Sequence, residues 1–214
     1  LALTNGAAAK LGNLSQKGGS ALVSGVATTM TVTNRHTQTD GTFVVSDGAT
    51  VRTKNAEIYG KAQMLLSEGA YTCSGSASIG VGSADVARIR VTGGNHRFEN
   101  GDTYLGKGCN AEILVEGGSL YAPRFRMGSE AKPTNTAVLR QTGRAGHVVA
   151  LVFSLHGRGF GVEQVGEEAA GIRAGKAERV SGLHDHFVRL TVVQRVGFLR
   201  PHARQRTQRA GRAA

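Results

Sequence analysis

A short pattern recurs along the first two thirds of the chain, and it limits the possible folds more than any other feature. Four segments share one template, which is an apolar residue, any residue, an apolar residue, any residue, a small or acidic residue, and then glycine. The segments are FVVSDGATV (43–51), MLLSEGAYT (64–72), IRVTGGNHR (89–97) and ILVEGGSLY (113–121), with aligned glycines Gly48, Gly69, Gly94 and Gly118. Because these glycines are 21, 25 and 24 residues apart, each repeat unit has room only for short strands and turns.

A second template lies between these segments and places an apolar residue beside a glycine. It occurs as AEIYG (56–60), ASIGV (77–81), TYLGK (103–107) and FRMGS (125–129), which makes Ile58, Ile79, Leu105 and Met127 equivalent. Each unit is therefore predicted to hold two short strands joined by corners that contain glycine. Alternate side chains of a strand point to the same side, so the apolar residues should form inward columns. The first-template columns are Phe43, Met64, Ile89, Ile113 and Leu139, and beside them Val45, Leu66, Val91 and Val115.

One unit cannot bury its apolar side alone, whereas stacked units bury these sides together and pair their backbones from coil to coil. The sequence therefore predicts an all-β fold, a parallel β-solenoid (β-helix) of roughly six coils. An antiparallel β-sandwich or barrel also has short strands at regular spacing, but its successive strands need not resemble one another. The insertions in this chain fall at the corners, where a solenoid tolerates them.

The composition changes near Gly143. Residues 1–143 carry a net charge of +4 and all eight Asn, whereas residues 144–214 carry +7 and no Asn. The ratio of Arg to Lys also changes, from 8:6 to 11:1, and no later segment fits either template. We therefore predict a β-solenoid repeat domain at 1–143 and an irregular, basic segment at 144–214 that adds nothing to the core. Two explanations of this segment stay open, namely a second domain or basic tail, and translation from a shifted reading frame of GC-rich DNA.

The repeats resemble those of large bacterial surface proteins, the autotransporter passenger-type β-helices with their autotransporter-associated repeats. The resemblance is carried by FVVSDGATV and by residues 65–87, 88–129 and 136–143, and it covers about residues 1–143. It implies a location on the cell surface or outside the cell, and a non-catalytic structural or adhesive role. The implied partners are a surface ligand of unknown kind or neighbouring solenoid coils of a longer protein. The chain begins with Leu, so we expect a fragment, and it has no apolar run long enough for a transmembrane helix.

Two sets of side chains have the spacing of a chemical site. Asp47 and Glu68 hold the same template position on neighbouring coils, which predicts a separation of about 5 Å. Two carboxylates that close can serve a retaining glycosidase or bind Ca²⁺. We interpret them as solvated turn residues, because glycines follow them in the column. His184 and His186, with Asp185 between them, have a spacing that some metal sites use, but a metal needs three or four ligands and no Cys or second His pair lies near them in the sequence.

The remaining candidate residues, which are cysteines and glycines, also indicate structural roles and not a chemical site. Cys73 and Cys109 fall in different columns, so we expect free thiols and no disulfide. The glycines of 80–90 and 106–110 lack the phosphate-loop pattern and should form corners. We therefore predict that the chain is not an enzyme and has no catalytic, cofactor or metal site. Two alternatives stay open: a β-helix carbohydrate-active enzyme, and non-specific nucleic-acid binding through the Arg-rich tail. We do not favour nucleic acid as a partner, because no aromatic residues interleave those arginines.

Overall fold

The protein is described by a computed structural model that covers residues 1–82, 85–128, 135–142, 146–156 and 160–165. All elements in these ranges are β-strands, and none is a helix. No helix in this part of the chain is therefore long and apolar enough to cross a membrane. The strands are β1 (Ala2–Leu3), β2 (Ala8–Ser24), β3 (Thr29–Ser46), β4 (Thr50–Tyr59), β5 (Gln63–Leu66), β6 (Ala70–Cys73), β7 (Ala77–Val81), β8 (Val86–Phe98), β9 (Asp102–Leu105), β10 (Asn110–Gly128), β11 (Ala137–Thr142), β12 (Gly146–His156) and β13 (Phe160–Val165).

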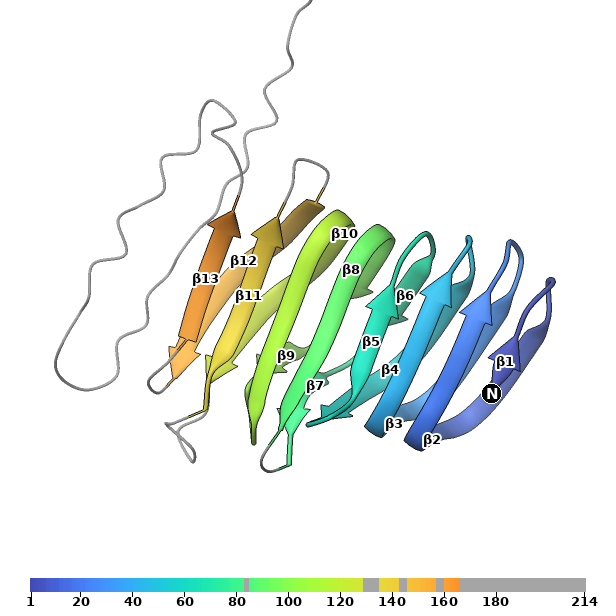
Figure 1. The fold of residues 1–214 in the computed structure, drawn as a ribbon, viewed down its shortest axis with the longest axis horizontal. Coiled ribbons are helices and arrows are strands. Elements are labelled where there is room, and N and C mark those ends of the chain that lie inside the picture. Colours follow the sequence, from blue (N-terminus) through green and yellow to red (C-terminus); the bar gives the residue numbers. More distant parts are fainter. Residues whose placement is uncertain (83–84, 129–134, 143–145, 157–159, 166–214) are drawn as a thin grey trace, which may run out of the picture.

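The strands stack in parallel as a solenoid of about six turns (Figure 1), which confirms the predicted fold class. Each coil contains three strands, whereas the sequence analysis predicted two. In one coil these are β5, β6 and β7, and in the next coil they are the two halves of β8 followed by β9. The prediction was wrong because the first template spans two strands. A left-handed turn at Asp47 and Gly48 separates them, and the alternation of side chains continues across that turn.

The three strands of each coil give the solenoid three outer faces. The first face comprises residues 20–24, 42–46, 63–66, 86–91, 110–116 and 137–142. The second face comprises residues 8–11, 29–32, 50–53, 70–73, 95–98 and 119–122. The third face comprises residues 13–16, 35–38, 55–59, 77–81, 102–105 and 124–128.

The inward columns have the predicted register. Phe43 pairs with Met64, Met64 with Ile89, and Ile89 with Ile113. On the third face, the column of the second template is equally regular, because Ile58 pairs with Ile79, Ile79 with Leu105, and Leu105 with Met127. These eight residues are at most 1% exposed, and Leu139, which follows Ile113 in the first column, is 2% exposed. The solenoid therefore has one continuous apolar core, and the four equivalent residues of the second template line up as the sequence predicted.

The template glycines are required by the close approach of neighbouring coils. Gly94 and Gly118 have φ angles of 73° and 69°, in the left-handed region that favours glycine. A Cβ atom on Gly94 would collide with the carbonyl oxygen of Gly69, one coil away. A Cβ atom on Gly118 would collide with the backbone of Gly93. At these corners the backbones of neighbouring coils are in direct contact, and only glycine leaves room for that contact.

The parallel ladder continues past Gly143, where the sequence predicted the end of the repeat. β12 pairs with β10 from Gly118 and Gly146 to Gly128 and His156, and β13 pairs with β11. The expectation that everything from residue 144 onward is irregular was therefore wrong for these two strands. The templates missed β12 because HVVALVFSL has apolar residues in both alternate positions, although Gly146 before it stands opposite the template glycine Gly118. Residues 166–214, with His184 and His186, lie outside the described residues, so the basic tail stays a prediction.

Candidate binding surfaces

The predicted carboxylate pair lies at the corner between the first and second faces. The backbone N–H of Gly48 donates a hydrogen bond to the carbonyl oxygen of Glu68, so Asp47 and Glu68 sit on neighbouring coils at that corner. The Asp47 carboxylate accepts hydrogen bonds from Ser24 Oγ at 2.5 Å and Ser46 Oγ at 2.8 Å. These two bonds lower the pKa of Asp47 below its usual value. The carboxylate thus joins its own turn to the preceding coil through Ser24, and no hydrogen bond joins it to Glu68 among the described residues.

Both cysteines are buried as free thiols. Cys73 Sγ lies 3.5 Å from the carbonyl oxygen of Lys54, and Cys109 Sγ lies 3.6 Å from that of Val81. Burial raises the pKa of the Cys73 thiol to about 11, so this side chain is not a nucleophile near neutral pH. The backbone N–H groups of Gly108 and Cys109 both donate to the carbonyl oxygen of Gly80, which makes these glycine-rich segments stacked corners.

A polar cluster interrupts the apolar core. His36 Nδ1 lies 3.1 Å from the Tyr71 hydroxyl, and the His36 ring lies 4.6 Å from the Phe43 ring. His96 Nδ1 accepts a hydrogen bond from the Tyr71 backbone N–H, and its Nε2 lies 2.8 Å from the Gly93 carbonyl oxygen. Burial lowers the pKa of His36 to about 4 and also lowers that of His96. These imidazoles are therefore neutral at pH 7 and act within the core, out of reach of a substrate.

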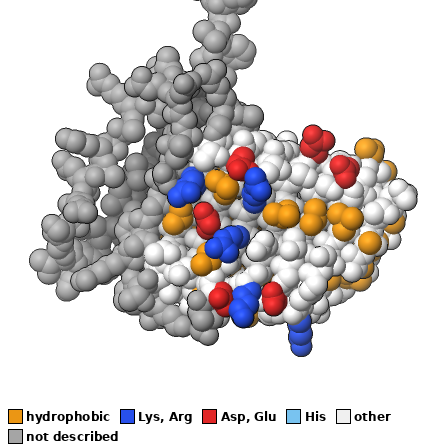
Figure 2. All heavy atoms as spheres, in the orientation of Figure 1, with side chains coloured by type: hydrophobic (Ala, Val, Ile, Leu, Met, Phe, Trp, Pro, Cys, Tyr) orange, Lys and Arg blue, Asp and Glu red, His pale blue; other side chains and the backbone are white. Residues whose placement is uncertain are grey.

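Charges on the first face are matched from coil to coil. Arg88 Nε lies 3.5 Å from Glu112, and Arg90 Nε lies 2.5 Å from Glu116. Beside these pairs runs a stripe of partly exposed apolar side chains from neighbouring coils (Figure 2), namely Leu22, Val44 and Leu65. A shallow depression of about 160 Å³ lies between Leu65, Leu114 and the two arginines. A depression of this size is smaller than the pockets that hold drug-sized ligands.

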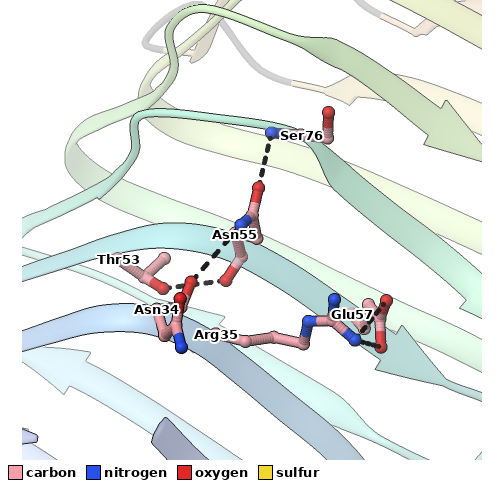
Figure 3. Close-up of polar contacts among 6 residues, drawn as sticks. All are labelled: Asn34, Arg35, Thr53, Asn55, Glu57 and Ser76. Atoms are coloured by element: carbon pink, nitrogen blue, oxygen red, sulfur yellow. Dashed lines mark hydrogen bonds and ion pairs between the residues drawn. The ribbon is translucent and has the colours of Figure 1, made fainter. Parts of the chain in front are cut away.

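Charges on the third face are matched in the same way. Arg35 Nη1 lies 3.3 Å from Glu57 on the next coil, and Asp102 lies 3.3 Å from Arg124 and 2.8 Å from Arg126. Figure 3 shows Asn55 beside the first of these pairs, bridging the coils above and below it. Its amide nitrogen donates to the carbonyl oxygen of Asn34 at 3.4 Å, and its Oδ1 accepts from the backbone N–H of Ser76 at 3.2 Å. This corner therefore holds three coils together by side-chain hydrogen bonds.

The second face differs from the other two, because none of its described cations forms an ion pair with an acid of a neighbouring coil. Lys10, Arg52 and Lys54 are exposed, and within the described ranges their side chains form no hydrogen bond or ion pair. Arg97 is paired with Glu99 at 3.0 Å. This surface cannot be derived from the sequence if each coil is given two strands. With the three-strand coil, the column that contains Lys10, Arg52 and Arg97 can be read directly from the sequence.

Comparisons with protein-family models, with curated proteins and with solved structures found no match to this chain. Within the described part of the chain, no three side chains of His, Cys, Asp or Glu lie close enough together to hold a metal ion.

Proposed function

We propose that this chain is a non-catalytic structural or adhesive repeat region of a bacterial cell-surface or secreted protein. The observation that carries the proposal is the regularity of the stack. Three outer faces repeat from coil to coil, and the inward columns hold them in register over about six turns. A solenoid of this kind presents an extended surface whose length grows with the number of coils, which suits a spacer or a multipoint contact.

The placement of the titratable groups supports this proposal. A catalytic acid, base or nucleophile has to reach its substrate, and such groups usually lie in a cleft with a shifted pKa. Here the neutral forms of His36, Tyr71, Cys73 and His96 are favoured by burial in the core. The exposed Asp47 is held by two serine hydroxyls at a corner. The resemblance of residues 1–143 to autotransporter-associated repeats adds the bacterial surface location to the proposal.

The location can be tested on the cells that make the protein. An antibody raised against residues 1–143 should label intact cells, and a protease added outside should remove that label. A cytoplasmic enzyme in the same cells should stay unlabelled and intact, which controls for leakage. Labelling that appears only after lysis would overturn the proposal of a surface or secreted protein.

A further inference from the structure

The second face carries a straight column of outward side chains that runs along the solenoid axis. The strand register places one residue of each coil in this column, in the order Lys10, Thr31, Arg52, Thr72, Arg97 and Tyr121. A cation therefore occurs on every second coil, with a threonine between each two. Because neighbouring parallel strands lie about 4.8 Å apart, the cations recur at roughly 10 Å. Lys54, one residue beyond the second-face segment 50–53, is exposed on the same strand as Arg52 and adds a positive charge beside the middle of the column.

A column of small side chains lies beside the cations. Its members pair from coil to coil in the order Ala8, Thr29, Thr50, Ala70, Asn95 and Ser119. None is larger than asparagine, so these side chains form a low shelf along the cation column. The hydroxyl and amide groups on the shelf can donate and accept hydrogen bonds. An extended polymer can therefore lie on the shelf with its charges toward the cations.

The electrostatics of this face favour an anionic partner. Glu99 is the one acidic residue in segments 8–11, 29–33, 50–54, 70–74, 95–99 and 119–122, and it is already paired with Arg97. Asp47 and Glu68 flank the face at its corner, where Asp47 is bonded to Ser24 and Ser46. On the first and third faces, the arginines contact acids of neighbouring coils at 2.5–3.5 Å. On the described strands of the three faces, the cations without an acid of a neighbouring coil thus lie on the second face, whereas Lys17 and Lys107 lie outside it.

We propose that the second face binds a linear acidic polysaccharide that carries one carboxylate on every second sugar. The spacing of the cations decides between this polymer and a nucleic acid. Each nucleic-acid strand has a phosphate at about 3.4 Å intervals along a duplex axis, so most phosphates would find no cation in a column spaced at roughly 10 Å. In a polymer with one carboxylate per two sugars, the charges lie farther apart than the phosphates of a nucleic acid. Their separation is therefore closer to the roughly 10 Å separation of the cations in the column. Tyr121 is the last residue of the column with a described side chain, and its ring lies 4.6 Å from the Arg97 guanidinium.

This inference rests on the proposed function, since it names the ligand of an adhesive solenoid. It can be tested on the purified full chain with a hyaluronan oligosaccharide, whose carboxylates fall on alternate sugars. Neutral dextran of similar mass and single-stranded DNA serve as comparison ligands. The double variant Lys10→Thr and Arg52→Thr removes two column cations, and it repeats the residue already present at Thr31 and Thr72. The matched control is Lys17→Thr with Lys107→Thr, which removes the same charge outside the second face.

We expect the unchanged protein to bind hyaluronan and not dextran. The column variant should lose roughly tenfold in affinity and show a shallower dependence on salt, because fewer charge contacts with the polymer are left for salt to screen. The control variant should bind like the unchanged protein, and any background from the Arg-rich residues 166–214 is common to all three. Far-ultraviolet circular dichroism and a melting curve confirm that the variants fold.

Three results would overturn the inference. Equal losses in the column and control variants would mean that only total charge matters. Equal affinity for dextran would exclude an electrostatic match. Tighter binding to DNA, with the same dependence on Arg52, would replace the polysaccharide with a nucleic acid. The antibody labelling of intact cells is independent of these measurements, so a chain that labels cells but ignores hyaluronan refutes the ligand and leaves the surface role standing.

Discussion

At the scale of single residues, the effect of a substitution depends on whether its side chain points into the stack. Val91 is 0% exposed in the middle of an inward column, and Thr92, the next residue, is exposed. Val91→Asp buries an unpaired charge, so we expect it to lower the free energy of unfolding by several kcal/mol. Thr92→Asp places the same charge in solvent and should change the free energy of unfolding by about 0.5 kcal/mol or less. Equal shifts in the midpoint of urea unfolding would show that the two side chains do not alternate.

The buried imidazole of His36 predicts a dependence of stability on pH. Its pKa is about 4 in the folded chain and 6.5 as a free side chain, so the unfolded chain binds the proton more tightly. The free energy of unfolding is therefore not reduced by His36 above pH 6.5, where the imidazole is neutral in both states. It falls as the pH drops from 6.5 toward 4, because the unfolded chain takes up the proton first. A difference of this size corresponds to about 3 kcal/mol. Urea unfolding at a series of pH values should show this loss.

His36→Gln provides the control for the pH effect, because glutamine does not titrate. Gln38, in the same strand, shows that the core accepts a buried glutamine that donates to backbone carbonyls. The variant should be less stable at pH 7 and should have a flatter pH profile than the unchanged protein. Some dependence of the stability on pH should remain in this variant, since burial also lowers the pKa of His96. An unchanged slope between pH 6.5 and 4 would assign the effect to other groups.

At the scale of the structural elements, the corners tolerate substitutions as poorly as the inward positions of the strands do. Gly94→Ala combines a left-handed φ with a collision against the Gly69 carbonyl oxygen, so we expect a loss of several kcal/mol in stability. Gly19 also has a positive φ, 66°, but open space around it, and Gly19→Ala should cost about 1–2 kcal/mol. Gly12 has open space and an ordinary φ, so Gly12→Ala should be neutral or slightly stabilising. Chemical denaturation of the three variants measures the order, and a Gly94→Ala midpoint equal to that of Gly19→Ala would exclude the collision.

The strands also show which features of the fold can be predicted from a repetitive sequence and which cannot. The inward columns, such as Ile58 and Ile79, could be predicted because alternation and a repeated template fix both the strand phase and the register. The third strand of each coil could not, because the bend at Gly48 leaves the alternation of apolar residues intact. The coil-to-coil ion pairs, such as Arg90 with Glu116, depend on which residues stack. That stacking becomes readable only after the number of strands in a coil is known.

At the scale of the whole molecule, the two ends of the stack decide how far the cooperative unit extends. At the N-terminal end, Leu3, Leu11 and Leu14 pack against the core but stay partly exposed, since no described coil covers them. In the last coil whose three strands all have described side chains, Leu120, Phe125 and Met127 are 0% exposed. β12 pairs with the strand that carries these three residues. The coil that contains β12 therefore protects an apolar end that would otherwise resemble the N-terminal one.

This protection predicts different outcomes for two truncations. A chain that ends after Thr142 loses β12 and β13, so the N–H and C=O groups of β10 and β11 lose their partners along one edge. We expect this chain to melt at a lower temperature than the full chain and to self-associate through the open edge. A chain that ends after Val165 keeps both strands and should melt like the full chain. Differential scanning calorimetry with light scattering measures both effects. If the two truncated chains melted alike, β12 and β13 would not belong to the cooperative stack, and the end of the repeat would return to Gly143.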